Sequence, residues 1–309
     1  LLLTEGMHGM ISQVEGMAKA LNAEFSHKII RLSFPWNFLP AKITPASQII
    51  LKDKIYLSND DSSDIIISCG RKSVAPSIFL KKKNPKIFTI HIQDPKVSLK
   101  NFDIVVAPEH DNLDGVNVIS SKGAIHYITE EEVSNSKSYL SSKIKGQKIV
   151  SIVLGGPNKY YNFNENQLKN IFTKIRSEFI NNDYKVIVIP SMRTPKLIIN
   201  LAAKEFEEDG HVVKNVDKKA YLSALALASC IVVTSDSTSM ISEAATSGKP
   251  IFIAHMKAKK NNYRFKKFYK LFKELGIVRD LGEKAENWKY AKLNEAERIA
   301  VKIKNKLNN

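Results

Sequence analysis

The chain has 309 residues, of which 43% are hydrophobic and 25% charged, and it carries a formal net charge of +16 at pH 7. These values are typical of a soluble globular protein, and the length exceeds the usual size of one hydrophobic core, so two domains are expected. No apolar run approaches the roughly 20 residues that a membrane-spanning helix needs, so an integral membrane protein is not expected.

The positive charge is uneven along the chain. Residues 1–148 hold 19 basic and 15 acidic residues, whereas residues 149–309 hold 28 and 16. Such a charge fits a polyanionic ligand, an anionic membrane surface or a nucleic acid, and nucleic acid ranks last because no known reading module is present. Cys69 and Cys230 end apolar runs and are expected to be buried thiols in a reducing compartment. The expected location is cytoplasmic, with peripheral attachment to the inner membrane face as the alternative.

The first half begins with Leu1 to Thr4, which we expect to be a strand rather than a signal peptide, because no basic leader precedes it. Apolar runs rich in Val and Ile follow at 28–34, 64–69, 86–93, 103–108 and 116–120. Helical periods occupy 12–22 and 71–82. Because the apolar runs are continuous rather than alternating, they predict strands of a parallel sheet with helices on both faces.

Polar residues follow several of these strands, where ligands bind in parallel α/β sheets. Gly6 and Gly9 either bring the backbone close to a sugar or phosphate, or only shape a strand-to-helix turn. Carboxylates beside histidines are suited to acid–base chemistry, and one of three acids is expected to be a general base. The candidates are Asp94, Glu109 and Asp111. His91 and His110 are assigned to the same acceptor side, although His91 lies within an apolar strand and is more simply a core histidine.

A polar, serine-rich stretch from 130 to 147 separates the two halves and predicts the domain boundary. We therefore expect an N-terminal Rossmann-like domain over 1–145 and a second over 146–285. The last segment, 286–309, contains an amphipathic helix over 295–307 that is expected to pack back on the first domain.

The second half repeats the pattern of strand and helix. Strands are predicted at 148–154, 184–190, 211–214, 230–234 and 250–255, and helices at 165–181, 195–209, 219–229 and 239–247. Alternating strands and helices predict an α/β fold, here two Rossmann-like domains facing across a cleft.

Three loops of the second half carry residues suited to a diphosphate. The first combines bare backbone with a lysine, the second offers an arginine fork, and the third is a run of hydroxyls before a helix. The candidate nucleotide-sugar-binding residues are Gly155, Gly156, Asn158, Lys159, Ser191, Arg193, Thr194, Asp236, Ser237, Thr238, Ser239 and Glu243.

The hydroxyl run from Thr234 to Ser239 allows three interpretations: a phosphate site, a nucleophile or a helix cap. A helix that starts near Thr238 leaves its first N–H groups unsatisfied and directed at an anion. Glu243 lies four residues after Ser239, one turn deeper, where it could accept hydrogen bonds from sugar hydroxyls. Ser237 has no nucleophile-elbow motif around it, so a hydrolase triad is not expected. The histidines show no metal-binding spacing, and neither a metal nor a cofactor is expected.

The stretch from Lys257 to Lys273 carries eight basic and five aromatic residues and no acid. Its aromatic side chains fall on one helical face, so they are expected either to pack on the second domain or to dock on anionic lipid. The residues proposed for membrane or anion contact are Arg264, Lys266 and Lys267.

Six motifs, in this order, carry a resemblance to a known family: "HIQDP", "APEHD", "KGAIH", "GGPNKYY", "SMRTP" and "TSDSTSMISEAATSGKP". They resemble the bacterial and plant mitochondrial-fission (elongated mitochondria) family, which is similar to two-domain GT-B glycosyltransferases and whose bacterial members have been labelled nucleoside-diphosphate-sugar epimerases. The last motif also resembles the donor loop of non-hydrolysing UDP-N-acetylglucosamine 2-epimerases. That resemblance assigns Ser237 to Ser239 to the diphosphate and Glu243 to the ribose, with Thr238 and Ser239 in place of two glycines.

The resemblance implies a glycosyltransferase-like protein that binds a nucleoside-diphosphate sugar between its domains without a metal. Two alternatives stay open: a nucleotide-sugar epimerase, and a non-enzymatic membrane or scaffold protein that uses the basic stretch 257–273. The motifs do not identify the nucleotide base, the sugar or the acceptor, and they do not indicate the oligomeric state.

Overall fold

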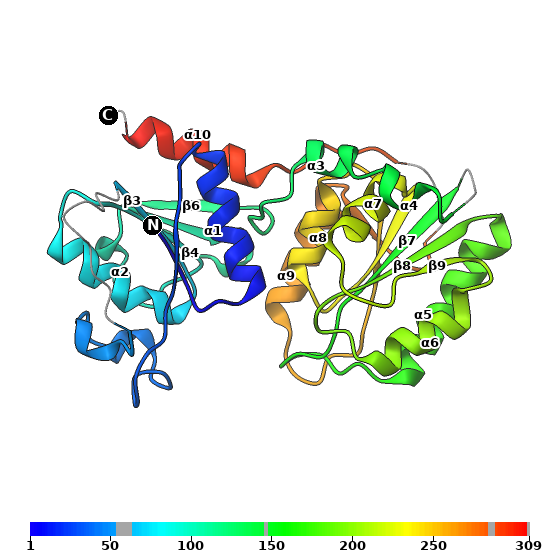
Figure 1. Cartoon of the computed structure of the whole chain (residues 1–309), viewed down its shortest axis with the longest axis horizontal. Coiled ribbons are helices and arrows are strands. Elements are labelled where there is room, and N and C mark those ends of the chain that lie inside the picture. Colours follow the sequence, from blue (N-terminus) through cyan, green and yellow to red (C-terminus); the bar gives the residue numbers. More distant parts are fainter. Residues whose placement is uncertain (54–63, 145–147, 284–287, 308–309) are drawn as a thin grey trace. The chain divides into compact units, whose positions relative to one another are not determined.

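The computed structural model describes residues 1–53, 64–144, 148–283 and 288–307. The chain forms two compact units, shown in Figure 1: unit 1 is Leu1–Tyr127 with Asn294–Asn309, and unit 2 is Ile128–Leu293. The predicted domain limits, at 145/146 and 285/286, lie outside the described residues. Residues 128–144, predicted to belong to the first domain, are grouped with unit 2.

Unit 1 is built on a six-stranded parallel sheet of order β2-β1-β3-β4-β5-β6. Its strands are β1 (Leu2–Thr4), β2 (His27–Ile29), β3 (Ile65–Cys69), β4 (Phe88–Ile92), β5 (Ile104–Pro108) and β6 (Val118–Ser121). Its helices are α1 (His8–Ala20), α2 (Arg71–Lys83) and α10 (Glu295–Leu307), with single 3-10 turns η1 (Ala41–Ile43), η2 (Gln48–Ile50), η3 (Leu99–Asn101) and η4 (Glu109–Asp111).

Unit 2 contains a second six-stranded parallel sheet, of order β12-β11-β10-β7-β8-β9. Its strands are β7 (Ile149–Leu154), β8 (Lys185–Pro190), β9 (Gly210–Val212), β10 (Cys230–Thr234), β11 (Ile251–Ala254) and β12 (Val278–Asp280). Its helices are α3 (Glu130–Asn135), α4 (Ser138–Ser141), α5 (Glu165–Glu178), α6 (Lys196–Phe206), α7 (Lys218–Leu227), α8 (Thr238–Ala245) and α9 (Tyr263–Glu274), with the turn η5 (Ile180–Asn182). The predicted α/β class with two parallel sheets is confirmed.

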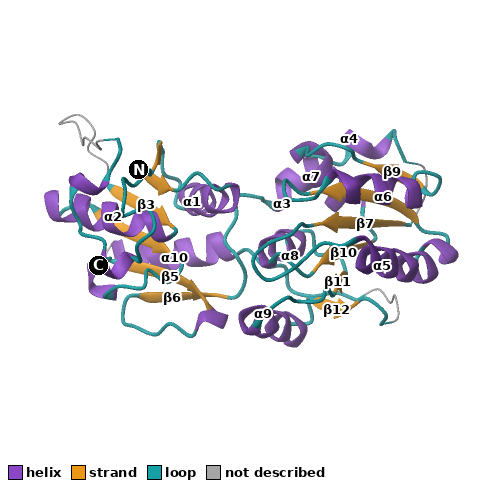
Figure 2. Ribbon diagram, turned by 90° about the horizontal axis from the view of Figure 1, so that it is seen from below, coloured by secondary structure: helices purple, strands orange, loops and turns teal. Residues whose placement is uncertain are grey.

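Both faces of each sheet are apolar, as the continuous hydrophobic runs predicted. In unit 2, Val150 and Ile152 pack with α5 and α6, whereas their neighbour Ile149 packs on the other face with α4 and α7. Successive side chains of a strand point to opposite faces, so a buried parallel strand needs apolar residues at every position. Figure 2 shows the helices of unit 2 on both sides of its sheet.

Unit 1 repeats this arrangement with a helix from the far end of the chain. Residues of α1 and of α10 share one core cluster with β1, β3, β4 and β5, and Figure 1 shows α10 (red) beside α1 (blue). Ile299 and Ile303 of α10 are fully buried there. Glu295, 6% exposed, anchors its start by accepting hydrogen bonds from the Lys122 amide (2.6 Å) and Arg298 (2.7 Å).

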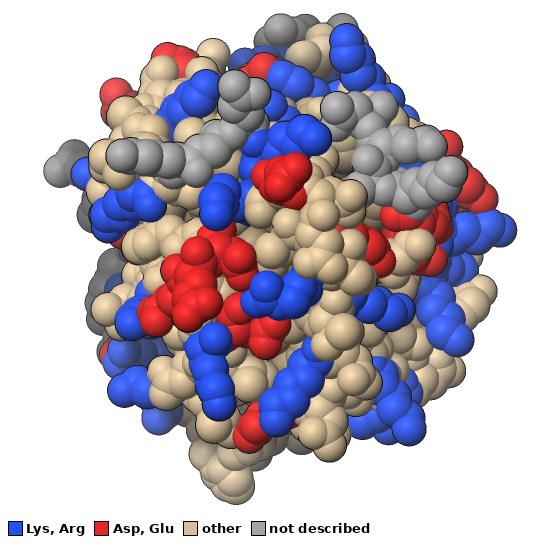
Figure 3. Space-filling model, turned by 90° about the vertical axis from the view of Figure 1, so that its right-hand side faces the viewer, with Lys and Arg blue, Asp and Glu red and all other residues tan. Residues whose placement is uncertain are grey.

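The surface charge is mixed on the face shown in Figure 3, where acidic side chains gather between basic ones. The net charge of +16 is therefore not gathered there into one continuous basic patch.

Candidate functional site

Three loops of unit 2 meet at the carboxyl ends of neighbouring strands β10, β7 and β8. Asp236, two residues after β10, is 2% exposed and lies where they join. Its carboxylate accepts hydrogen bonds from Thr234 Oγ1 (2.7 Å), the Gly156 amide (3.0 Å) and Arg193 Nη2 (2.7 Å). One buried acid thus ties together the three loops whose residues were predicted to bind a diphosphate.

Arg193, predicted to fork onto a diphosphate, instead faces the protein. Besides Asp236, its guanidinium donates to the carbonyl of Gly156 (2.6 Å). Burial raises the pKa of Asp236, and the charge of Arg193 together with the hydrogen bonds from Thr234 and Gly156 opposes that rise. A buried charge needs such a partner, since leaving either member unpaired is costly. Arg193 therefore neutralises Asp236.

Gly155 and Gly156 are glycines because other atoms occupy the space of a side chain. A Cβ on Gly155 would lie 2.1 Å from the carboxylate of Asp236, and one on Gly156 would lie 2.0 Å from the carbonyl oxygen of Arg193. The sequence led us to expect that this bare backbone approaches a phosphate. In the structure it approaches Asp236 and Arg193 instead.

The remaining residues of the first two loops divide into structural and accessible ones. Thr194 is 9% exposed and donates to the carbonyls of Leu154 (2.9 Å) and Gly155 (2.6 Å), so it fixes the loop. Ser191 contacts the Thr194 hydroxyl at 3.1 Å. Asn158 donates to the carbonyl of Asp236 (3.0 Å), whereas the exposed Lys159 lies over the ring of Tyr160.

Helix α8 begins at Thr238, as predicted. Ser237 is its N-cap and accepts a hydrogen bond from the Met240 amide (3.4 Å), which is the helix-cap interpretation of the hydroxyl run. Thr238 and Ser239 are only half-buried, so the start of the helix is accessible at the edge of unit 2. The amides of these two residues are among the four that an α-helix leaves without partners in its own ladder.

Glu243 lies one turn further along α8 and is half-buried. The hydroxyl of Tyr221, on α7, donates to its Oε2 (3.0 Å). Burial raises the pKa of Glu243 to about 7, against the hydrogen bond from Tyr221, which lowers it. This carboxyl group therefore changes charge near neutral pH. Tyr221 was not predicted as a site residue, because nothing in the spacing connects α7 with α8.

A second polar pair, also not predicted, lies at the ends of β11 and β12. His255 Nε2 and Asp280 Oδ1 are 2.6 Å apart, and Lys273 of α9 also pairs with Asp280. Burial alone would raise the pKa of Asp280, but hydrogen bonds from Lys273 and His255 hold this pKa below its ordinary value. The strand β12 is only three residues long, too short for an apolar run to reveal.

Helix α9 carries the basic stretch, and four of its five aromatic side chains pack inward. Phe268, Tyr269 and Phe272 are buried, and Phe265 packs edge-on against Tyr161 at 5.2 Å between ring centroids. These four rings are therefore not available to enter a membrane, and the core alternative holds for them. The fifth, Tyr263, is 60% exposed. Arg264 and Lys266 are exposed, while Lys267 is half-buried over the ring of Tyr263.

In unit 1, Gly6 and His91 have structural roles, whereas the surroundings of Gly9 do not require a glycine. Gly6 adopts a φ of +83° at the turn after β1, a conformation that favours glycine. Gly9 lies in the first turn of α1, where a Cβ would meet no other atom within 4 Å. His91 is 1% exposed, and its Nδ1 lies 2.9 Å from Ser68 Oγ. Burial lowers its pKa to about 3, against the charge of Asp94, so it is a neutral core histidine.

The three candidate bases follow the adjacent strands β4 and β5 and so share one edge of the sheet. Asp94 accepts from the Lys96 amide (2.8 Å) and pairs with the Lys96 ammonium. Asp111 is 8% exposed at its side chain and lies 3.6 Å from His110 Nε2. Glu109 is exposed. Of the three carboxylates, that of Glu109 is the most open to a substrate.

Neither a metal cluster nor a membrane span is present in the described residues. Within residues 1–53, 64–144, 148–283 and 288–307, no group of three or more His, Cys, Asp and Glu side chains is arranged to hold a metal ion. In the same ranges, no helix has the length and apolar character needed to cross a membrane.

Sequence comparison gives a match over nearly the whole chain. The profile of the family described as Mitochondrial fission ELM1 matches residues 8–307. An uncharacterized protein of Rickettsia prowazekii (strain Madrid E), RP120, is 26% identical over 93% of this chain and 93% of that protein. Mitochondrial fission protein ELM1 of Arabidopsis thaliana is 24% identical over 80% of this chain, and the match spans 64% of the plant protein.

Structural comparison also gives matches over nearly the whole chain. UDP-GlcNAc 2-epimerase from Methanocaldococcus jannaschii is similar with a TM-score of 0.52 and 15% identity, over 98% of both chains. UDP-GlcNAc 2-epimerase from Neisseria meningitidis, solved bound to UDP-GlcNAc, has a TM-score of 0.52 and 12% identity over 99% of both. At such identities the likeness shows the fold, a GT-B-like pair of Rossmann-type units.

Proposed function

Because the chain belongs to the mitochondrial fission ELM1 family and has a GT-B-like fold, we propose that unit 2 binds a nucleoside-diphosphate sugar. The observation that carries this proposal is the edge formed by the accessible start of α8 and the Glu243–Tyr221 pair one turn deeper. Glycosyl transfer from this sugar to an acceptor hydroxyl, without a metal, is the reaction we propose for it.

The diphosphate would lie at the start of α8. There the amides of Thr238 and Ser239 and the positive end of the helix dipole favour an anion, and the hydroxyls of the same residues add donors. Arg193 contributes little net charge, since Asp236 neutralises it. The exposed ammonium of Lys159 adds a positive charge to the same group of loops.

The ribose would bind Glu243. A carboxylate accepts two hydrogen bonds from neighbouring hydroxyls, and Tyr221 holds it in place. Because the pKa of Glu243 is about 7, the group is only partly ionised at neutral pH. Nucleoside binding is therefore expected to strengthen as the pH rises through 7.

In the transfer reaction, a base would take the proton of the acceptor hydroxyl while the helix amides hold the departing diphosphate. We propose Glu109 for this role before Asp94 and Asp111, because its carboxylate is exposed whereas theirs are engaged or largely buried.

Isothermal titration with UDP-, GDP- and ADP-sugars and with pyrophosphate tests the binding proposal. Glu243→Ala is expected to weaken binding of the preferred nucleotide sugar about tenfold or more, and pyrophosphate by less than about threefold. Tyr221→Phe is the matched milder variant. Binding weaker than millimolar for all three nucleotide sugars would contradict the proposal, as would equal losses for nucleotide and pyrophosphate in Glu243→Ala.

Sugar epimerisation is the second candidate, favoured by a fold shared over the whole chain with two UDP-GlcNAc 2-epimerases. It differs from transfer in requiring loss of the sugar C2 proton. Incubation with UDP-GlcNAc in deuterated water, followed by proton NMR, separates the two: exchange at C2 without an added acceptor supports epimerisation, and its absence with acceptor-dependent release of UDP supports transfer.

A further inference from the structure

A closed loop of unit 1 connects β2 to β3 and exposes an unusual amount of apolar surface. Its neck is an antiparallel bridge between Leu32 and Leu51, reinforced by the Ser33 amide donating to the carbonyl of Ile50 (2.8 Å). We name residues 33–50 the docking loop. It lies below α2 in Figure 1, in blue.

The docking loop is ordered by contacts to the rest of unit 1. Ala41 and Ile50 are buried and Trp36 is partly buried against the core of unit 1. The guanidinium of Arg71 on α2 donates to the carbonyls of Leu39 and of Asn37, the latter at 2.6 Å. The loop is therefore held in a defined conformation, and its exposed side chains are presented by a fixed backbone.

Four large apolar side chains of this loop point to solvent. Phe34 is 80% exposed, Phe38 77%, Ile49 77% and Ile43 57%. Isolated exposed apolar residues are ordinary, but several on one short ordered loop mark an interaction surface.

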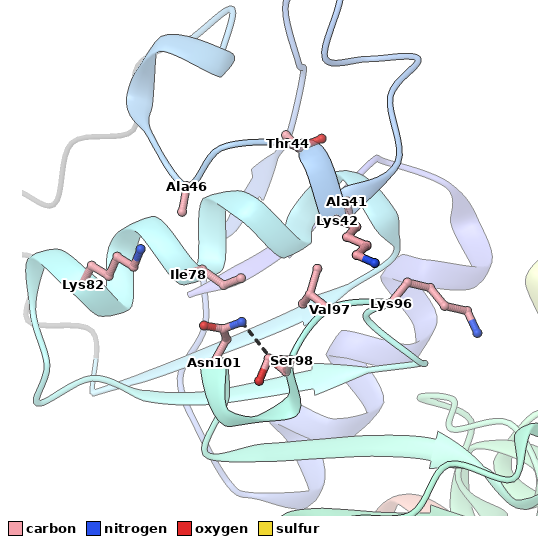
Figure 4. A pocket seen from close by; sticks show the side chains of 10 residues that line it. All are labelled: Ala41, Lys42, Thr44, Ala46, Ile78, Lys82, Lys96, Val97, Ser98 and Asn101. Atoms are coloured by element: carbon pink, nitrogen blue, oxygen red, sulfur yellow. Dashed lines mark hydrogen bonds between the residues drawn. The ribbon is translucent and has the colours of Figure 1, made fainter.

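The docking loop and its flanking residues carry basic side chains. Residues 25–52 contain Lys28, Arg31, Lys42 and Lys52 and no acidic residue, and the acids Glu24 and Asp53 lie at the two ends of this stretch. Beneath the loop, a pocket is lined by Ala41, Lys42, Thr44, Ala46, Ile78, Lys82, Lys96, Val97, Ser98 and Asn101, with no acid among these described residues. Figure 4 shows Lys42 and Lys96 at one end, Lys82 at the other, and Ile78 and Val97 between them.

We propose that the docking loop binds the surface of an anionic lipid bilayer. Phe34, Phe38, Ile43 and Ile49 would enter the boundary between headgroups and acyl chains, while Lys42 and Lys82 meet headgroup phosphates. An apolar contact combined with basic side chains is what stable attachment to a bilayer requires, since either alone binds weakly. Lys96 adds less, because it is paired with Asp94.

The proposal moves the membrane contact away from α9, the helix formed by the basic stretch of the sequence. Helix α9 has exposed basic residues, but of its five aromatic side chains only Tyr263 is exposed, and the other four pack into unit 2. The docking loop has both exposed apolar side chains and an exposed basic one, Lys42. The nucleotide-binding proposal concerns other residues, those of α7 and α8 together with Lys159 of unit 2.

Vesicle flotation with the full chain tests the proposal. Wild type is expected to float with vesicles of equal parts phosphatidylglycerol and phosphatidylcholine, and not with phosphatidylcholine alone. The pairs Phe38→Ser/Ile43→Ser and Lys42→Glu/Lys82→Glu are each expected to lower the partition coefficient at least about tenfold. Binding that survives in both pairs would overturn the proposal, as would failure of wild type to float.

Two control pairs match these variants. Val216→Ser/Val301→Ser removes two apolar side chains outside the docking loop, which are 55% and 59% exposed. Lys266→Glu/Lys270→Glu changes the charge of α9 by the same amount as Lys42→Glu/Lys82→Glu changes that around the docking loop. Both are expected to float like wild type. If only the α9 pair loses binding, the membrane contact lies on α9. If the loop variants abolish self-association in sedimentation and leave flotation unchanged, the loop binds protein, and the lipid proposal is wrong.

Trp36 provides a readout within the docking loop. In the Trp288→Phe background, its fluorescence is expected to shift to the blue on adding anionic vesicles and to be quenched by lipids brominated near the headgroup. An unchanged spectrum in a sample that floats would overturn the assignment to this loop. Nucleotide titration of the same variants keeps the two proposals distinguishable, because the loop variants should bind nucleotide as wild type does.

Discussion

Units 1 and 2 share one plan, a six-stranded parallel sheet covered by helices, yet they hold charge differently at the carboxyl edge. In unit 2, Asp236 is 2% exposed and joins three loops through Arg193 and Gly156. In unit 1, the ion pair Glu5–Lys72 joins the loop after β1 to the start of α2, whereas Asp94–Lys96 lies within one loop; their lysine side chains are 30% and 77% exposed.

The difference teaches that a shared topology does not fix how rigid its loops are. A buried, fully bonded acid holds three loops in one arrangement, whereas surface pairs contribute little and adapt easily. We expect unit 2 to bind a ligand part that stays constant and unit 1 to tolerate variation. Urea unfolding measures how much each substitution lowers the free energy of unfolding, so substitutions in unit 2 can be compared with milder ones. In single-tryptophan variants, Trp288 reports on unit 2 and Trp36 on unit 1.

The largest expected effect comes from Asp236→Ala. Removing the carboxylate leaves the buried amide of Gly156 and the buried hydroxyl of Thr234 without their acceptor and takes the counter-charge from Arg193, which is 38% exposed. The expected cost is about 3–5 kcal/mol in the free energy of unfolding of unit 2. Asp94→Ala in unit 1 should cost about 1 kcal/mol or less. Equal losses in the two units would show that the edge of unit 2 is no more tightly built than that of unit 1.

Gly156→Ala is expected to come next. Its new Cβ would lie 2.0 Å from the carbonyl oxygen of Arg193, a backbone atom that cannot move aside by changing rotamer. We expect a loss of about 3 kcal/mol. Gly9→Ala in α1, with no atom within 4 Å, should stay within about 0.5 kcal/mol of wild type. A neutral Gly156→Ala would mean that the loops of unit 2 yield readily.

Glu243→Gln is expected to have the smallest effect, and one that depends on pH. Because folding raises the pKa of Glu243 from 4.5 to about 7, the folded state binds its proton more tightly. Wild type should lose stability relative to the glutamine variant as the pH rises from about 4.5 to 7, by on the order of 2 kcal/mol, and the difference should then level off. Tyr221→Phe, which removes the lowering hydrogen bond, should move the upper limit of this window to higher pH. A difference that is flat across pH would contradict the raised pKa.

The sequence predicted most of the strands because buried parallel strands are written as continuous apolar runs. It did not reveal β12, whose three residues include Arg279 and Asp280, or α3, whose polar composition hid the helix. A signal for α3 was present: Thr129 and Glu132 have the spacing of a capping box, and the structure forms one.

The convergence of the three loops of the candidate site was predicted, but the hydrogen bonds between them were not. The loops at Gly155, Arg193 and Asp236 converge as expected, since the ends of neighbouring parallel strands meet. Which of their charges would neutralise each other depends on distances between separate loops, so Arg193 was assigned to a ligand rather than to Asp236. The same holds for Glu243 and Tyr221, whose hydrogen bond joins two helices.

Helix α10 has a consequence for the order in which the protein is made. Ile299, Ala300 and Ile303 complete the core of unit 1, yet they follow the whole of unit 2 in the chain. On the ribosome, unit 2 can therefore finish folding while the earlier-made strands of unit 1 still lack the helix that covers them. The unit that is begun before the other is completed after it, and its apolar sheet face depends for its cover on residues that are translated after all of unit 2.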